Sequence, residues 1–356
     1  MNEKEFDQLL SIDEETLVTE TKQLQKQLNR KVFMTTLKQV LLLLVLVCMS
    51  ILFVSKGMNM LYYNPLKPSD EVKSEKNEFQ FLMQTYTGLF YPQHAYLSTT
   101  GLDQSKGFAS YSMYGRLVPI FGYVSYDNSY NVQYDIKRNH LDTFNLSNGY
   151  ETALFVDLFV DASIDDDPYY KETLDSKRIT EDIKQEINAL PDSSRIEVAV
   201  SFDQVKSLEE VCTWMMQYKD SDFSWIALQN QEKHAYGSYL GIQLQTRSWY
   251  DLNKEADNRY PQLQLQYGQD KDSKQLQQAF VSRLQLLLDH QDFLTMMPLA
   301  TTFDLEKTLS QAKQEPLQTI GVYGLFTKAD FIEMMKDNPD SFIHIEDVSL
   351  SILDHH

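Results

Sequence analysis

The sequence predicts an α+β protein in which a single transmembrane helix is followed by a β-rich module and then by an α+β module. Three observations predict this class: one uncharged apolar run near the N-terminus, aromatic-rich alternating segments in the middle, and two strand, capped helix, strand units in the second half. We expect five regions: a cytoplasmic helical segment at 1–38, a transmembrane helix at 39–56, a stalk at 57–78, a β-rich extracellular module at 79–170 and an α+β extracellular module at 171–356.

The apolar run at residues 39–55 contains no charged side chain. As a helix it is roughly 26 Å long, close to the hydrocarbon thickness of a bilayer. Lys38 and Lys56 flank it and can extend their ammonium groups to the two membrane surfaces. A cleaved signal peptide would have a shorter leading segment and a small-residue cleavage site, which VSKGMNM does not offer. A buried core helix would need protein on every side. We therefore expect one retained membrane span.

The orientation of this span follows from the basic residues beside it. On its N-terminal side they fall in a stretch without acidic residues: Lys22, Lys26, Arg30, Lys31 and Lys38. On its C-terminal side Lys56, Lys67 and Lys73 are interleaved with acidic residues. The positive-inside rule then predicts a cytoplasmic N-terminus and an extracellular C-terminal region in the cell membrane.

The formal net charge of −19 arises entirely beyond residue 56, because residues 1–56 carry seven basic and seven acidic side chains. This excess argues against direct binding of nucleic acid by the C-terminal region, since phosphate binding needs clustered Lys and Arg. The two cysteines, Cys48 and Cys212, are predicted to lie in the membrane and in the extracellular region. We therefore expect no disulfide framework, and the core alone must hold the extracellular region together.

The segment before the span is predicted to be helical. Ser11 and Glu14 have the spacing of a capping box, which predicts that a second helix begins there. Apolar residues at helical spacing precede and follow this point: Phe6, Leu9, Leu10, Leu17, Leu24 and Leu28, with Thr21 in the same stripe. The stripe has nothing to bury against within so short a segment. It either pairs with itself, lies along the membrane surface, or docks into a cytoplasmic partner.

Beyond the span, residues 62–78 are polar and contain two prolines, which predicts a stalk. From residue 78 to residue 160 we expect a mostly β module, with strands within 107–126, at 130–136 and at 151–160. The aromatic residues between Phe90 and Tyr134 either line a groove for a sugar or peptide or pack in the core of the sheet.

The remaining chain alternates strands and helices. Pro191 ends a helix, Ser207 caps a second one, and Thr327 caps the last. We expect helices at 181–190, 208–218, 275–293 and 328–337, and strands at 195–202, 222–229, 241–245, 262–268, 319–326 and 343–353. Because the strand, capped helix, strand order occurs twice, the sequence predicts an α+β sandwich with helices on one face of a sheet.

Motifs of catalysis are missing from the sequence: there is no G-x-S-x-G, no phosphate-binding G-x-x-x-x-G-K-[ST], no H-E-x-x-H and no cysteine cluster for zinc. We therefore expect no enzyme activity, no catalytic residues, no metal ligands and no cofactor. One acidic group could supply oxygen ligands to calcium, but it lacks the glycine and distal glutamate of the calcium loop: Asp157, Asp161, Asp165, Asp166 and Asp167. A solvated acidic turn is the alternative interpretation.

The second half also resembles a known family. SRIEVAVSFDQVKSLEEVCTWM, followed by DFSWIAL and YGSYLGIQL, resembles the C-terminal domain of the membrane-anchored sigma factor regulators of Gram-positive bacteria. The ending IGVYGLFTKADFIEMMKDNPDSFIHIEDVSL resembles the closing unit of that domain, and the span with its β-rich sequel is similar to the N-terminal region of the family.

This resemblance implies an anti-sigma factor, in which the cytoplasmic segment sequesters an extracytoplasmic-function sigma factor and the extracellular region senses the state of the envelope. The implied docking residues are those of the apolar faces: Phe6, Leu9, Leu10, Leu17, Leu24 and Leu28. Many family members have a longer cytoplasmic segment, and the H-x3-C-x2-C zinc element of other anti-sigma proteins is absent from the sequence.

Two other functions remain open at the level of sequence. The protein could be a membrane-anchored module that binds the cell envelope through its tyrosine-rich region, or an accessory subunit of a complex with a second membrane protein. The route by which a signal crosses a single helix is equally open between proteolytic release, a rigid-body shift and a permanently bound membrane partner.

Overall fold

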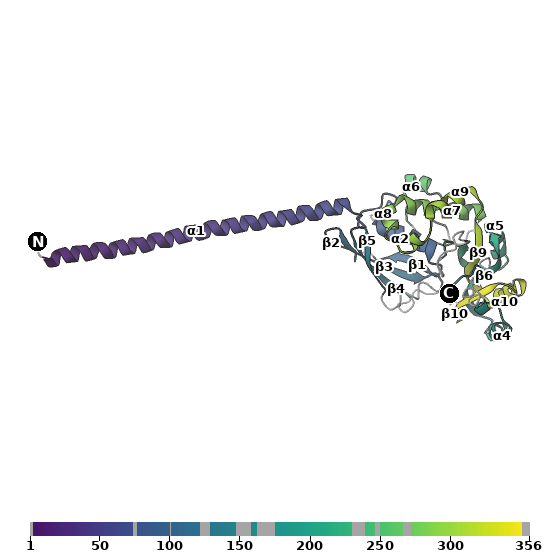
Figure 1. Ribbon diagram of the computed structural model, residues 1–356. Helices are drawn as coiled ribbons and strands as arrows, with labels where there is room; N and C mark the ends of the chain where they lie inside the picture. Colours follow the sequence, from purple (N-terminus) through teal and green to yellow (C-terminus); the bar gives the residue numbers. More distant parts are fainter. Residues whose placement is uncertain are drawn as a thin grey trace. The chain divides into compact units, whose positions relative to one another are not determined.

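The computed structural model describes residues 3–73, 77–99, 101–121, 129–146, 158–161, 175–229, 239–245, 250–265 and 272–350. The chain divides into two compact units, Met1–Leu61 and Tyr62–His356, and each is described by itself. Figure 1 shows the elements of both units, numbered along the chain.

The N-terminal unit is one uninterrupted helix, α1 (Glu3–Leu61), which is about 88 Å long at 1.5 Å per residue. The prediction that a second helix begins at Ser11 is wrong, because the backbone is helical through this position. No glycine or proline occurs between Glu3 and Lys56, so nothing in the sequence near Ser11 forces one helix to end and another to begin.

The described part of α1 contains one segment, Leu24–Leu61, that is long and apolar enough to cross a membrane, with a mean hydropathy of 2.6 in its most apolar window. None of that window is buried within the protein. Exposed apolar surface of this extent is not tolerated in water, so the helix is consistent with a single-pass membrane anchor.

The C-terminal unit contains an unpredicted helix, α2 (Glu78–Phe90), where the sequence suggested a β module. Every residue of α2 is buried, and the helix packs against β1 (His94–Ser98), α7 (Ser273–Asp289) and β8 (Gly241–Gln243). Because protein surrounds the helix, polar residues such as Gln80, Gln84 and Thr87 are buried together with its apolar residues, which an apolar stripe alone does not predict. Asn77 caps it, with Oδ1 accepting from the amide of Gln80 at 3.0 Å.

The first sheet is antiparallel and has the order β1-β3-β4-β5, with β2 paired to β3. Its further strands are β2 (Gln104–Gly107), β3 (Ser110–Pro119), β4 (Tyr130–Lys137) and β5 (His140–Leu146). Most of the strand expected at 151–160 lies outside the described residues. Its last three residues, 158–160, are buried but belong to no strand.

The second sheet has the order β10-β6-β9-β7-β8, and all its neighbours are antiparallel. The helix α5 (Leu208–Met215) connects two of its strands, and α10 (Lys328–Asp337) connects two others. The strands not yet defined are β6 (Ser194–Ser207), β7 (Asp222–Leu228), β9 (Gln318–Thr327) and β10 (Phe342–Leu350). One unit is β6-α5-β7 and the other is β9-α10-β10. The two units interlock, because β9 lies between β6 and β7, and β6 lies between β9 and β10.

Both crossover helices lie on one face of this sheet, as the sequence predicts. The ring of Phe326 on β9 is 6.4 Å from that of Trp214 on α5 and 5.7 Å from that of Phe331 on α10. Tyr323, three positions earlier on the same strand, faces the opposite side and stacks on Phe121 with a ring separation of 6.0 Å. This alternation follows from the two-residue period of a strand.

The remaining helices lie between β8 and β9 in the sequence, apart from α4 (Glu181–Ala189), which precedes the second sheet. They are α6 (Lys254–Arg259), α7, α8 (Gln291–Leu294), the 3₁₀ helix η2 (Leu299–Thr302) and α9 (Leu305–Gln314), and Figure 1 shows α6, α7, α8 and α9 grouped together. Two predictions are wrong here. The helix expected at 275–293 is broken at His290, and residues 262–265 of the strand expected at 262–268 form no strand.

A shared core joins the two sheets. Phe159 stacks on Trp225 of β7 with ring centroids 5.5 Å apart, and the indole N–H donates to the carbonyl of Gly88 in α2 at 3.1 Å. The core cluster draws on β1, β3, β6, β7, β9 and the segments beside them: Ala95, Val118, Ile120, Phe121, Leu158, Phe159, Ala199, Trp225, Ala227, Ile320 and Tyr323. The β-rich and α+β regions are thus parts of one compact unit.

Candidate functional site

The six docking residues suggested by the sequence all belong to α1. Phe6, Leu9, Leu10 and Leu17 lie on its backbone, and their side chains are outside the described part of the structure. Leu24 and Leu28 are described, and their side chains are 65% and 64% exposed. These two leucines therefore lie one helical turn apart on an uncovered apolar face.

The two lysines that flank the predicted span also lie on α1. Lys38 and Lys56 are both exposed, at the two ends of the uncharged run. This placement leaves their ammonium groups able to reach the interfacial region of a membrane.

The other candidate sites of the sequence give little support to ligand binding. Aromatic side chains considered for a sugar groove are largely buried in the unit: Phe90, Tyr91, Tyr96, Tyr111, Phe121 and Tyr134. Asp161 is buried, whereas Asp157, Asp165, Asp166 and Asp167 lie outside the described residues. Among described residues, no group of three His, Cys, Asp or Glu side chains is arranged to hold a metal ion.

The most elaborate polar arrangement involves residues 62–73, which directly follow α1 in the sequence and are called the strap below. Its composition suggested a stalk, yet the strap packs on the C-terminal unit. The amide of Lys73 donates to the carbonyl of Asp251 at 2.8 Å, and the amide of Asn253 donates to the carbonyl of Glu71 at 2.9 Å. Tyr63 and Val72 are buried. The strap is therefore an ordered part of the unit.

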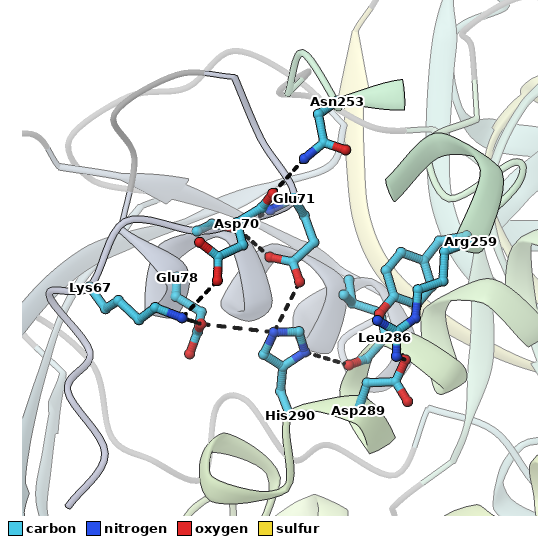
Figure 2. A network of polar contacts seen from close by, with 11 residues as sticks. Lys67, Asp70, Glu71, Glu78, Asn253, Arg259, Leu286, Asp289 and His290 are labelled. Carbon is cyan, nitrogen blue, oxygen red and sulfur yellow. Dashed lines mark hydrogen bonds and ion pairs between the residues drawn. The ribbon is translucent and has the colours of Figure 1, made fainter. Parts of the chain in front are cut away.

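His290 lies at the centre of the contacts that hold the strap (Figure 2). Its Nε2 atom is 3.3 Å from Oε1 of Glu71 in the strap and 3.9 Å from Oε2 of Glu78 at the start of α2. Its Nδ1 atom is 2.8 Å from the carbonyl oxygen of Leu286 in α7. The imidazole thus connects the strap, α2 and α7, and only 14% of its side chain is exposed.

The backbone explains why His290 can reach all three groups. His290 has φ −116° and ψ 59°, so it ends α7 and precedes α8 without belonging to either helix. Its amide donates to the carbonyl of Leu287 at 3.1 Å. The break in the helix therefore directs the ring toward the strap instead of along the surface of α7.

The electrostatics of the three central groups follow from burial and pairing. Burial opposes the charged form of His290, but its bonds to Glu71 and to the Leu286 carbonyl raise the pKa of His290 overall. Burial also opposes ionisation of Glu71, but hydrogen bonds from His290 and Ser69 lower the pKa of Glu71 to about 2. Burial dominates at Glu78, so the pKa of Glu78 is raised.

Further ion pairs surround this centre. Lys67 Nζ is 2.8 Å from Oδ2 of Asp70 and 3.8 Å from Oε2 of Glu78. Lys73 Nζ is 2.7 Å from Oδ1 of Asp251. The amide side chain of Asn253 donates to the carbonyl of Asp70, as Figure 2 shows. These outer contacts are largely exposed and contribute little each, so the buried His290 contacts dominate the arrangement.

Arg259 and Tyr260 complete the network on the side of α7. Arg259 Nη2 is 2.8 Å from Oδ2 of Asp289, and the hydroxyl of Tyr260 donates to the same oxygen at 2.8 Å. Asp289, the residue before His290, is therefore paired with Arg259 and Tyr260.

Sequence reasoning missed Glu71, Glu78 and His290 altogether. A histidine between two helices and two glutamates in a charged segment belong to no motif, and they are brought together only by the folded chain. The one local signal was that a helix running through His290 would have placed its polar ring on the same face as Leu287 and Phe293.

Comparison with known families gives one result: residues 187–339 match the model described as sigma factor regulator C-terminal. The comparisons with curated proteins and with solved structures give no match. The matched region runs from the end of α4 to the end of α10 and includes His290, Asp251 and Asn253, whereas the strap lies outside it. Residues 187–339 are thus similar to the C-terminal domain of sigma factor regulators.

Proposed function

We propose that this protein is a single-pass membrane anti-sigma factor. Its N-terminal segment, residues 1–38, is cytoplasmic and sequesters an extracytoplasmic-function sigma factor. Its C-terminal unit lies outside the cell and responds to the state of the envelope. The observation that carries the proposal is the match of residues 187–339 to the sigma factor regulator C-terminal model. That family is regulatory, which agrees with a protein that is not an enzyme.

The exposed face of α1 supports the sequestering role. Leu24 and Leu28 leave a large apolar area uncovered on a helix that also carries polar residues, as is typical of helices that dock into a groove of a partner. The docking residues proposed are Phe6, Leu9, Leu10, Leu17, Leu24 and Leu28. Apolar anchors of this kind typically contribute about 1 to several kcal/mol each to binding.

The charge distribution supports the proposed orientation. Basic residues without acidic neighbours precede the apolar run, and the strongly acidic remainder follows it. An acidic extracellular unit does not bind nucleic acid, so the effect on transcription is exerted through the sigma factor. The lipid bilayer holds the apolar part of α1.

The test is a co-purification of the tagged full-length protein, solubilised from its native membrane, with mass spectrometry of the bound proteins. We expect a sigma factor to be recovered with the wild-type protein and lost from the double variant Leu24→Asp with Leu28→Asp, which should release sigma-dependent transcription. The matched control is Gln25→Asp with Asn29→Asp, which adds the same two charges at the same spacing about a quarter-turn around α1. Equal recovery from all three proteins, with unchanged transcription, contradicts the proposal.

A further inference from the structure

The strap occupies a special position in the chain. It begins at the residue that follows α1, so its backbone is the covalent connection between that helix and the rest of the C-terminal unit. Its second half is attached by two backbone hydrogen bonds, one to the carbonyl of Asp251 and one from the amide of Asn253. Beside these bonds, Glu71 anchors the strap through a largely buried contact with His290, whereas the pair of Lys73 with Asp251 is exposed.

The hydrogen-bond chemistry of His290 makes this anchor depend on a proton. The Leu286 carbonyl can only accept, so Nδ1 must carry a hydrogen. In the neutral tautomer that satisfies Leu286, Nε2 carries a lone pair and faces the carboxylate oxygens of Glu71 and Glu78. Only the imidazolium ion donates from both nitrogens. A neutral ring can donate either to the Leu286 carbonyl or to the carboxylates of Glu71 and Glu78, but not to both.

The surrounding charges also favour the imidazolium ion. Carboxylates face the ring from the strap and from α2, through Glu71 and Glu78, and Asp289 and Asp292 flank it in sequence on α7 and α8. The nearby cations are Lys67, which pairs with Asp70 and lies within 3.8 Å of Glu78, and Arg259, which pairs with Asp289. The phenols of Tyr63 and Tyr260 stay neutral, because burial raises the pKa of each. A proton on His290 therefore offsets an excess of negative charge.

We propose that His290 is a proton-controlled clasp: its protonated ring fixes the strap to the C-terminal unit, and loss of that proton frees the strap around Glu71. Because the strap continues into α1, the clasp determines whether the membrane helix is tied to the folded unit or joined to it by a loose tether. This regulatory role rests on the proposed function, whereas the clasp itself does not. An alkaline shift outside the cell would then release the strap.

The clasp is tested by hydrogen–deuterium exchange of the full-length protein in lipid nanodiscs at pH values from 6 to 9, with rates corrected for intrinsic exchange. We expect peptides covering the strap and Asn253 to lose protection as the pH rises. The loss should be up to about tenfold for each unit by which the pKa of His290 is raised. Peptides of β6 and β9 should keep their protection.

Three variants make the test specific. His290→Gln should abolish the pH dependence of strap protection, and Glu71→Gln should weaken it. The matched control His344→Gln removes a histidine that pairs with Glu346 at 3.4 Å on β10, and it should retain the wild-type response. Protection of β6 and β9 reports whether each variant is folded. A strap whose protection does not change with pH in the wild type, or changes equally in His290→Gln, overturns the clasp.

The regulatory step has a separate readout. With sigma-dependent transcription as the measure, His290→Gln should give the same output at pH 6 and pH 8, whereas the wild-type output should change with pH. If no sigma factor co-purifies, the proposed function fails while the exchange experiment still decides the clasp. If a sigma factor does co-purify but the wild-type output ignores pH, the clasp is not the regulatory element.

Discussion

His290 Nε2 lies 3.3 Å from Glu71 Oε1, and this contact joins the residues after α1 to the junction between α7 and α8. The pairing of an imidazole with a largely buried carboxylate stabilises the charged forms of both groups. Since each partner determines the ionisation of the other, removing one should change the titration of its neighbour.

The first prediction concerns that coupling. Replacing Glu71 by Gln should lower the pKa of His290, because the variant keeps the burial that opposes the imidazolium ion and loses the carboxylate that favours it. The measurement is a histidine NMR titration of wild-type and variant protein in detergent micelles. Lys73→Gln, which removes only the exposed pair with Asp251, serves as the control and should leave the titration unchanged. A His290 titration that is the same in Glu71→Gln would show that Glu71 does not stabilise the charged ring.

The second prediction is a pH dependence of folding stability with two separate ranges. The pKa of His290 is raised in the folded state above its ordinary 6.5, so its contribution is present below pH 6.5 and is lost as the pH rises through the raised value. The pKa of Glu78 is also raised, so its contribution is present below pH 4.5 and is lost as the pH rises through the raised value. The pKa of Glu71 falls from 4.5 to about 2, so its contribution is present above pH 4.5 and is lost as the pH falls toward 2.

Chemical unfolding of the full-length protein between pH 3 and pH 9 checks this prediction. The free energy of unfolding should decline on both sides of a maximum in the mildly acidic range. His290→Gln should reduce the decline on the alkaline side to the part that Glu78 contributes. The variant should also reduce the decline on the acidic side, because Glu71 loses a partner that lowers its pKa. A stability that rises from pH 6 to pH 8.5 in the wild type would contradict the proposed charge state of His290.

The third prediction concerns the cap of α10. The hydroxyl of Thr327 accepts from the amide of Asp330 at 3.1 Å at the point where β9 becomes α10. Thr327→Ala should lower the free energy of unfolding by about 1 kcal/mol, because one amide at the helix N-terminus loses its partner. Thr327→Ser keeps a hydroxyl and should retain most of the stability. Urea unfolding curves measure both variants, and equal loss in the two would point to the methyl group instead of the cap.

The sequence predicted the second sheet well because its signals are local. Ser207 and Thr327 each end a strand and cap the helix that follows, and both caps form as expected, with Glu210 completing a capping box at Ser207. Such signals depend on residues within one turn of each other. The order of strands in the sheet follows from the doubled strand, helix, strand pattern once the two units interlock.

The features that the sequence did not predict depend on long-range packing. The helix α2 mixes apolar residues with polar ones such as Gln80, Gln84 and Thr87, and all of them are buried because the whole unit surrounds the helix. Its complete burial therefore does not follow from the pattern of its own residues. The strap is polar and proline-containing, which is typical of a flexible linker, but its backbone is held by Asp251 and Asn253 from far along the chain. The contacts of His290 likewise form only when the folded chain brings Glu71 and Glu78 next to it.

The fourth prediction tests the core that joins the two sheets. A Cβ atom on Gly241 of β8 would clash with the indole ring of Trp225, which is fully buried and stacks on Phe159. The indole cannot move away easily, because its N–H donates to the carbonyl of Gly88 in α2. Gly241→Ala should therefore lower the free energy of unfolding by about 1–3 kcal/mol, as overpacking of a dense core usually does. Gly57→Ala is the control, since a Cβ atom there meets nothing within 4 Å, and it should leave the C-terminal unit as stable as before. Unfolding followed by tryptophan fluorescence compares the two variants. If Gly241→Ala is as stable as the control, β8 is not packed against Trp225, and the shared core does not fix the edge of the second sheet.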